Sequence, residues 1–425
     1  MTLRKTSSKG SSAPTRNIDE SFKLSNTKTQ VTRRVKLFGK SYSTSIPVIS
    51  AKPNYSPSEI FDKSWLQLER KAHDSRRPDF LIADLFCGCG GLSIGGMEAA
   101  EAFNLRPCVS FSADIDECAL SVYRSNLAPD IATNTPIEVI FPIRNTKPDA
   151  KIVLPETVDF LIGGPPCQGH SDLNNHTRRD DPRNDLYSVM ARAAKRLSPK
   201  LILIENVPGV RHSKSNVVEQ TLSTLEGLGY KLHQVVLNAA DFGVAQSRKR
   251  HFVLGTTGDI EIVKETIEAL RRPQRNVLWA INDLDSKDGG TTFDSPATHS
   301  ATNSKRISYL FKHQLYELPD SQRPDCHKLK EHTYKSVYGR MYPDKPAPTI
   351  TSGFGSTGQG RFVHPHKPRT LTPHEAARIQ FFPDWFSFGD AQRRNLQKLI
   401  GNAVPPKLGY ALALALIASI KAARK

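Results

Sequence analysis

The chain has 425 residues, of which 38% are hydrophobic, and a formal net charge of +17. This length allows two domains, or one large α/β domain that carries an insertion. No apolar run approaches the length of a membrane span, and the polar N-terminus lacks the apolar region of a secretory signal. The six cysteines show neither the CxxC spacing of a zinc site nor a regular disulfide framework. We therefore expect a protein of a reducing compartment, and the positive charge indicates a polyanionic partner.

The positive charge is concentrated toward the N-terminus. Residues 1–77 contain sixteen Lys and Arg against six Asp and Glu. Residues 1–57 are also rich in Ser and Thr and have little periodic apolar content. We expect them to form a disordered basic tail that acts as an electrostatic arm for nucleic acid. A short helix is predicted over residues 59–72.

From residue 80 onward, apolar runs typical of buried strands alternate with segments of helical periodicity. Strands are predicted at 80–86, 108–113, 158–162, 201–204, 231–237 and 251–255, with a weaker strand at 137–141. Strands separated by helices predict an α/β fold on a mainly parallel, doubly wound sheet. The alternation of strands and helices is lost after residue 258. We therefore expect residues 259–368 to form a smaller, irregular domain. An apolar helix at 407–421 is expected to pack back on the sheet.

A glycine-rich turn follows the first of these strands. Residues 84–91 read Asp-Leu-Phe-Cys-Gly-Cys-Gly-Gly, and glycines between a strand and a helix let a ligand approach the backbone closely. Asp114 ends the second strand, where its carboxylate can accept hydrogen bonds from both hydroxyls of a ribose. Ile115 beside it can pack on an adenine ring. Together these features favour an adenosine-containing cofactor, although a turn and a cap would explain each residue alone.

A single cysteine follows the strand at 158–162. The sequence there continues as Gly163-Gly-Pro-Pro-Cys-Gln-Gly-His-Ser171, and its glycines and prolines end the strand. Cys167 is therefore expected on a stiff loop at the carboxyl end of a buried strand, where open α/β sheets place their chemistry. The alternative is an inert, buried thiol.

Charged side chains accompany two further strands. Glu205 ends an apolar strand, and a carboxyl group in such surroundings can hold a raised pKa and donate a proton at neutral pH. A salt-bridged loop acid is the alternative. Gln246, Arg248 and Arg250 alternate into the strand at 251–255 and should share one side. Arginine donors suit a carboxylate, a phosphate or a base carbonyl oxygen, whereas a surface basic cluster is the plainer interpretation.

Six motifs in this order resemble those of the DNA cytosine-5 methyltransferases, over roughly residues 80–258 and 346–415. Each motif alone is a weak or moderate signal, but the ordered set is specific. The motifs are Asp84-Leu-Phe-Cys-Gly-Cys-Gly-Gly91, Gly164-Pro-Pro-Cys-Gln168, Glu205-Asn-Val207, Gln246-x-Arg-x-Arg250, Arg369-x-Leu-Thr-x-x-Glu375-x-x-Arg378 with Gln380, and Gly401-Asn-Ala-Val-Pro-Pro406.

The resemblance implies an enzyme that methylates carbon 5 of a cytosine flipped out of double-stranded DNA, with S-adenosyl-L-methionine as cofactor and without a metal. It implies that Cys167 attacks ring carbon 6 while Glu205 protonates ring nitrogen 3. Arg250 would contact the cytosine carbonyl oxygen, with Arg248 as its support. The implied cofactor contacts are Phe86, Gly88, Gly90, Gly91, Asp114, Ile115 and Asn402. Ser171 and residues 172–183, with Arg178, Arg179 and Arg183, resemble the loop that closes on DNA.

The resemblance also implies a Rossmann-like methyltransferase sheet with a smaller, irregular target-recognition domain. The expected divisions are the basic tail at 1–57, the first part of the catalytic and cofactor domain at 58–258, the target-recognition domain at 259–345, and the hinge and return to the catalytic domain at 346–425. Thr349, Gly353, Gly358 and Gly360 resemble the hinge-side residues. By analogy, we expect a monomeric, cytoplasmic, prokaryotic enzyme of a restriction-modification system, without a membrane and nucleoid-associated when on DNA.

Two positions depart from the family pattern. Residue 170 is His where the family usually has an aromatic or other apolar side chain, and no acid after the third strand can be assigned to the adenine amino group. Two other functions share these motifs: a tRNA cytosine-5 methyltransferase and a non-catalytic DNA-binding relative. The basic tail and the insertion favour DNA over tRNA. The intact Cys167, Glu205, Arg248 and Arg250 favour an enzyme over a non-catalytic relative.

Overall fold

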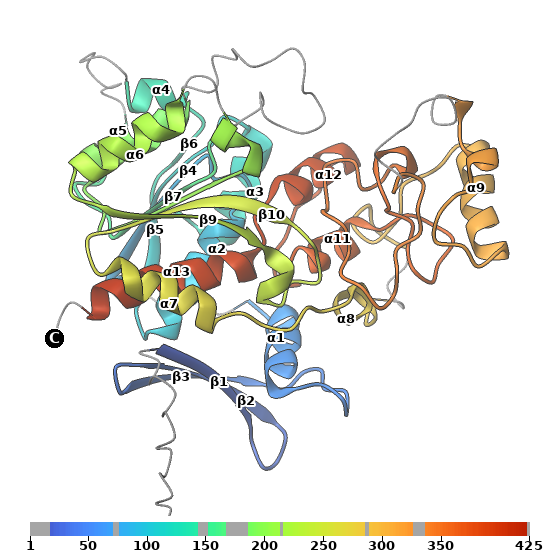
Figure 1. Ribbon diagram of the computed structural model, residues 1–425, viewed down its shortest axis with the longest axis horizontal. Helices are drawn as coiled ribbons and strands as arrows, with labels where there is room; N and C mark the ends of the chain where they lie inside the picture. The colour runs from blue at the N-terminus through green and yellow to red at the C-terminus, as the bar shows by residue number, and fades with distance from the viewer. Residues whose placement is uncertain are drawn as a thin grey trace, which may run out of the picture.

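The computed structural model describes residues 18–70, 76–142, 152–166, 186–212, 216–284, 289–325 and 336–422. Its main feature is a seven-stranded sheet in the order β6-β5-β4-β7-β8-β10-β9 (Figure 1). The first five of these pair in parallel, and β10 is antiparallel to both β8 and β9. The predicted α/β fold is confirmed, with one antiparallel edge. The strands are β4 (Phe80–Leu85), β5 (Pro107–Ala113), β6 (Ala132–Thr133), β7 (Phe160–Gly163), β8 (Leu201–Asn206), β9 (Lys231–Asn238) and β10 (Lys249–Thr256).

Helices cover both faces of this sheet (Figure 1). Alternate residues of each strand point to opposite faces, so Leu161 packs in one core and Ile162 in the other. The first core lies under α4 (Ile137–Ile140), α5 (Val189–Leu197) and α6 (Val217–Gly227). The second lies under α2 (Gly91–Ala102), α3 (Glu117–Leu127), α7 (Ile260–Ala269) and α13 (Pro406–Ala422).

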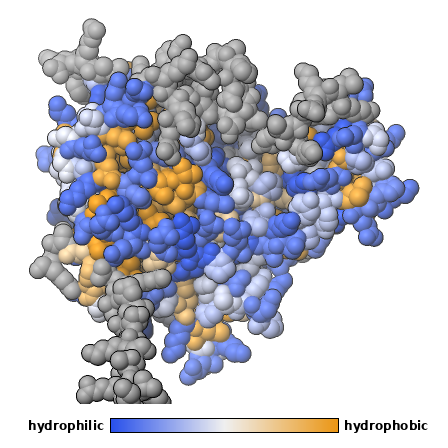
Figure 2. Space-filling view, in the orientation of Figure 1, coloured by the Kyte–Doolittle hydropathy of each residue, from blue (hydrophilic) through white to orange (hydrophobic). Residues whose placement is uncertain are grey.

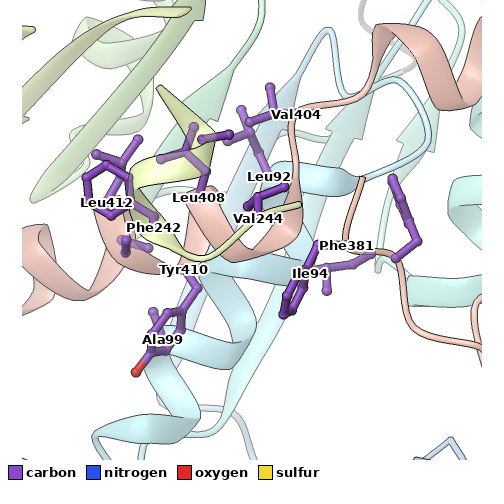
Figure 3. Close-up of a cluster of buried hydrophobic side chains, with 14 of the residues drawn as sticks. Leu92, Ile94, Ala99, Phe242, Val244, Phe381, Val404, Leu408, Tyr410 and Leu412 are labelled. Atoms are coloured by element: carbon purple, nitrogen blue, oxygen red, sulfur yellow. The ribbon is translucent and has the colours of Figure 1, made fainter. Parts of the chain in front are cut away.

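The C-terminal helix α13 crosses α2 at very short range, as the apolar pattern at 407–421 predicted. A Cβ atom on Gly95 would come within 2.5 Å of the Pro406 carbonyl oxygen, so only glycine permits this approach. Figure 3 shows part of the core at this crossing, with Leu408, Tyr410 and Leu412 of α13 near Leu92, Ile94 and Ala99 of α2. By length and composition, residues Arg393–Ala422 pass as a membrane-spanning stretch, but 89% of their apolar window is buried inside the protein. This segment is therefore a core element.

The N-terminal region differs from the expected disordered tail at 1–57. Within it, β1 (Ile18–Leu24), β2 (Gln30–Leu37) and β3 (Lys40–Pro47) form an antiparallel sheet, and α1 (Pro57–Gln67) follows. The prediction was wrong for residues 18–57: buried side chains alternate with more exposed ones along β2, so one face of this strand packs against the protein. The buried residues are Val31, Arg33, Val35 and Leu37. Figure 1 shows this sheet below α7 and α13.

Two other boundaries differ from the sequence prediction. Residues 137–140 form the helix α4 rather than a strand. Ile137 and Ile140 are buried on one side of this single turn, a spacing of three residues that suits a helix rather than a strand. The third strand is instead the short β6. The irregular region also begins later than the expected residue 259. The helix α7 still belongs to the main sheet layer, because it packs against α13 and β9.

Short helices and long loops make up the remaining part of the chain, on the right in Figure 1. Figure 2 shows that the surface over α9 is mainly hydrophilic. The helices are α8 (Val277–Ile281), α9 (Ala301–Lys312), α11 (Pro373–Ile379) and α12 (Arg393–Asn402). A capping box begins α11, with the side chains of Thr372 and Glu375 accepting hydrogen bonds reciprocally from backbone N–H groups.

Candidate active site

A cavity of about 780 Å³ opens at the carboxyl ends of β4, β5, β7 and β8. This is the edge at which parallel α/β sheets bind ligands. The structure brings nearly all of the described candidate residues together in its wall. Those lining it are Phe86, Gly88, Gly91, Asp114, Ile115, Glu205, Arg248, Arg250 and Asn402.

One side of the cavity is formed by the glycine turn and Asp114. The Gly88 N–H donates to one carboxylate oxygen of Asp114 at 2.8 Å, and the Asp116 N–H donates to the other at 2.9 Å. These bonds fix the carboxylate at the strand end, and burial raises its pKa. Ile115 is 71% exposed beside it, and half-buried Phe86 lies in the same wall. The arrangement offers acceptors for hydroxyl groups next to apolar surface that a flat ring can cover.

The glycines of the turn have different physical roles. Gly88 has φ +53° and nothing within 4 Å of its Cβ position, so its open side leaves room for a ligand. Gly90 does not line the cavity; it has φ +98°, and its Cβ would meet the Leu127 side chain at 2.6 Å. Gly91 lines the cavity, but its Cβ would clash with the Val404 carbonyl oxygen at 2.2 Å. Gly90 and Gly91 are therefore required at least for packing.

The other side of the cavity contains an acid and an arginine from adjacent antiparallel strands. Glu205 of β8 pairs with Phe252 of β10, which places the Arg250 guanidinium beside it. The Arg250 Nε lies 3.0 Å from Glu205 Oε1. Burial raises the pKa of Glu205, and the charges of Arg250 and Arg248 partly offset this effect. The carboxyl group is thus held where it can carry a proton more readily than an exposed glutamate.

Arg248 supports the site through the backbone of two distant segments. Its guanidinium, buried at 2% exposure, donates to the Ile350 carbonyl at 2.9 Å and to the Asn402 carbonyl at 3.5 Å. Gln246 is also fully buried: its side chain donates to Gln380 at 2.7 Å and accepts from the Ile350 N–H at 2.6 Å. These side chains therefore have two roles. Gln246 and Arg248 hold the backbone near residues 350 and 402 in place, while Arg248 and Arg250 form part of the cavity wall.

The predicted nucleophile, Cys167, lies outside the described residues, as do His170, Ser171 and the loop 172–183. The described chain stops at Pro166, which lines the cavity. Asn206 donates to the Pro165 carbonyl at 3.0 Å and so holds this strand end against β8. Burial raises the pKa of the thiols at Cys87, Cys89, Cys108 and Cys118, which disfavours a thiolate at each of these described cysteines.

Sequence reasoning missed three contributors to the wall. Residues 135–138, which follow β6 and begin α4, line the cavity where the third-strand acid was sought. Lys398 of α12 also lines it and pairs with Asp116 at 2.6 Å. Asp84, known from sequence only as the start of the glycine motif, is buried in the wall. Lys398 could not be predicted as a cavity residue, because it belongs to none of the motifs and α12 reaches the cavity only in the folded chain.

Residues 80–418 match the family model of the C-5 cytosine-specific DNA methylases. The protein therefore belongs to this family and is a DNA cytosine-5 methyltransferase. Membership of the family implies use of S-adenosylmethionine and action on DNA.

Individual relatives support the same assignment. The chain is 47% identical over 395 residues to the type II methyltransferase M1.BsuMI of Bacillus subtilis (strain 168), covering 90% of this chain and 92% of the relative. It is 31% identical to the type II methyltransferase M.DdeI of Desulfomicrobium norvegicum, over 78% and 87% of the two chains. Among solved structures, the methyltransferase EhMeth of Entamoeba histolytica has a TM-score of 0.51 at 17% identity, covering 81% of this chain and 99% of that one. This last similarity concerns the fold alone.

Proposed function

We propose that the protein methylates cytosine within a specific double-stranded DNA sequence as the modification enzyme of a restriction-modification system. The observation that carries this proposal is that one cavity joins two sets of groups: Gly88 and Asp114 on one side, and Glu205 and Arg250 on the other. The type II methyltransferases M1.BsuMI and M.DdeI, which the chain matches over most of its length, support the biological role.

The cofactor side fits S-adenosyl-L-methionine. The open face of Gly88, the fixed carboxylate of Asp114 and the exposed Ile115 suit a backbone contact, a ribose and an adenine ring in that order. Phe86, Gly91 and Asn402 complete this side, and Gly90 supports it by packing. When bound there, the cofactor supplies an electrophilic methyl group.

We assign the chemistry on the base to four side chains. Cys167, on the loop that continues from Pro166, bonds as a thiolate to ring carbon 6 of the flipped cytosine. Glu205 donates its proton to ring nitrogen 3, which makes carbon 5 electron-rich. Arg250 holds Glu205 and the base carbonyl oxygen, and Arg248 keeps the strand in place. Carbon 5 would then take the methyl group that the bound cofactor supplies, and loss of the proton from carbon 5 would release the thiolate and restore the aromatic ring.

The target-recognition region, in this proposal, consists of the loops and short helices between α8 and residue 345. These lie beyond the sheet layer in Figure 1, and their mainly hydrophilic surface in Figure 2 suits a polar partner. We further propose that the enzyme acts as a monomer and is nucleoid-associated when on DNA. The oligomeric state is measured by analytical ultracentrifugation with and without a DNA duplex.

The test compares methyl transfer to duplex DNA and to tRNA, followed by bisulfite sequencing of the methylated DNA. We expect transfer to DNA only, at one short sequence. Cys167→Ser should abolish turnover and the covalent complex formed on DNA with 5-fluorocytosine, while cofactor binding is retained. Cys108→Ser, at a half-buried thiol outside the cavity, is the matched control and should remain active. Transfer to tRNA alone, or an active Cys167→Ser variant, would refute the proposal.

A further inference from the structure

One carboxyl group in the cavity wall, that of Asp84, has no part in the proposed mechanism. It is 1% exposed and lies near the end of β4, beneath the glycine turn. The Ser93 hydroxyl of α2 donates to Asp84 Oδ2 at 2.7 Å. The Tyr123 hydroxyl of α3 lies 3.3 Å from the same oxygen and 2.5 Å from the Ser93 hydroxyl. Three elements that frame the cofactor side of the cavity therefore meet at this carboxyl group.

The groups that face Asp84 are neutral or negative. Asp114, at the end of β5, is a carboxylate in the same wall. The thiols of Cys87 and Cys89 and the phenol of Tyr123 all have pKa values raised by burial, so they are uncharged near neutral pH. Among the described residues, no lysine, arginine or histidine forms a salt bridge with Asp84, and Lys398 of the same wall is paired with Asp116.

A buried carboxylate without a counter-charge costs free energy, so the group retains a proton more readily. Burial raises the pKa of Asp84 to about 7. Near neutral pH the group is thus divided between its two protonation states. A cation that enters the cavity would supply the missing counter-charge and favour the ionised form, because charges interact strongly inside a protein.

The methyl donor and its product differ in this respect, since the donor carries a positive sulfonium and the product a neutral thioether. We propose that Asp84 discriminates the cationic methyl donor from its neutral product, releasing its proton to solvent when the donor occupies the cavity. The proposal rests on the proposed function, because it takes S-adenosylmethionine as the ligand of this cavity. Asp84 acts through its charge, and no bond to the ligand is made or broken.

The discrimination should depend on pH with a definite sign. The donor binds better to the ionised form of Asp84, so its affinity rises as the pH rises through the range in which this group titrates. The product gains nothing from the ionised form. If the donor lowers the pKa of Asp84 by one unit, the ratio of the two affinities changes by up to about tenfold across the titration.

The experiment is isothermal titration calorimetry of the full chain with S-adenosylmethionine and with S-adenosylhomocysteine at pH 6, 7 and 8. Buffers of different ionisation enthalpy report the protons released on binding. We expect more proton release with the donor than with the product at pH 7. The preference for the donor should also rise several-fold from pH 6 to pH 8. The α-amino and α-carboxyl groups occur in both ligands and are matched in this comparison.

Three variants separate the role of Asp84 from a structural one. Asp84→Asn should abolish the difference in proton release and the pH dependence of the preference. Ser93→Ala removes a hydrogen-bond donor to the carboxylate, so it should move that pH dependence to higher pH. Asp130→Asn, at an exposed carboxylate outside the cavity, should leave both unchanged.

Equal proton release with the two ligands in the wild-type protein would overturn the inference and leave the methyltransferase proposal intact. Failure of both ligands to bind would instead refute the proposed cofactor, and the inference with it. If Asp84→Asn does not fold, Ser93→Ala still decides: an unshifted pH dependence in that variant would contradict the assignment to Asp84.

Discussion

Two carboxyl groups of the cavity, the buried Asp84 and the half-buried Glu205, have different electrostatic surroundings. Glu205 has the Arg250 guanidinium 3.0 Å away, whereas the side-chain donors to Asp84 in the described part of the chain are the hydroxyls of Ser93 and Tyr123. Burial raises the pKa of both groups, and the arginines offset part of this effect at Glu205 alone. Each group therefore retains a proton more readily than an exposed carboxyl group does, but the two lie at opposite sides of one cavity and serve different purposes.

Glu205→Gln tests the proton donor. The amide keeps the size and the hydrogen-bonding capacity of the side chain but has no acidic proton, so kcat should fall by roughly 10²–10⁴-fold. Steady-state methyl transfer to duplex DNA measures the effect, with circular dichroism as a check on folding. Glu226→Gln, at an exposed position of α6, is the control and should keep normal activity. Undiminished kcat in Glu205→Gln would exclude this role.

Asp84→Asn tests the cost of burying an unpaired carboxylate. A carboxyl group whose pKa is raised on folding, here from 3.8 to about 7, stabilises the protein below its unfolded pKa and loses that contribution as the pH rises through 7. The loss amounts to on the order of 4 kcal/mol over this window. The melting temperature of Asp84→Asn, relative to that of wild type, should therefore increase from pH 5 to pH 8. A constant difference in thermal denaturation would contradict the assignment.

At the scale of single residues, the sequence predicted most groups of the cavity because they stand in motifs at strand ends. It could not predict what those groups contact. The sequence suggests Arg248 as a support for Arg250, a role that stays a prediction, but it gives no sign that two of its guanidinium nitrogens donate to the carbonyls of Ile350 and Asn402. These partners lie 102 and 154 residues further along the chain. Contacts over such separations depend on the path of the chain through the irregular region, which has no periodic pattern.

At the scale of elements, six strands of the main sheet were predictable from apolar runs, whereas the short β6 and the N-terminal sheet were missed. Arg33 interrupts the apolar side of β2, which makes the strand look polar in sequence. In the structure its guanidinium pairs with Glu98 of α2 at 2.7 Å and lies over the rings of Phe61 and Tyr410. Because the partners of the buried Arg33 are distant in sequence, its charge made β2 look like a solvent-exposed segment, although this strand packs against the core.

The two faces of β2 offer a direct test of this packing. Val35 is 1% exposed and Arg34 is exposed on the opposite face. Val35→Ala should lower the free energy of unfolding by about 2 kcal/mol, because it leaves a cavity beneath the sheet. Arg34→Ala should change it by less than about 0.5 kcal/mol. Urea denaturation of both variants distinguishes a docked sheet from a solvated tail, for which the two substitutions would have equal, small effects.

At the scale of the whole molecule, a network of ion pairs between buried cations and partly exposed carboxylates joins α1, the end of α8, α11 and the loop after α11. Arg378 of α11 is 1% exposed and donates to Asp384 at 2.5 Å and to Asp283, after α8, at 3.0 Å. Lys63 of α1 also contacts Asp283, at 2.5 Å, and His374 contacts Asp384 at 3.0 Å. These ion pairs and hydrogen bonds thus connect the N-terminal region to the irregular part of the chain. A sequence motif marks Arg378, but nothing in the sequence marks its partners.

Arg378→Met should be destabilising and pH-dependent. Removing the guanidinium leaves the carboxylates of Asp283 and Asp384 without their main counter-charge. Because water still reaches both carboxylates, the cost should stay below the roughly 3–5 kcal/mol of a fully buried pair. The arginine lowers the pKa of both carboxyl groups, so its stabilising contribution is present above their unfolded pKa and is lost as the pH falls. The difference in unfolding free energy from wild type should therefore be large at pH 7 and smaller at pH 4, as measured by urea denaturation. Arg394→Met, at an exposed position of α12 with no salt bridge among the described residues, should show neither effect. An Arg378→Met penalty that is the same at both pH values would mean that lost packing, rather than unpaired charge, is its cause.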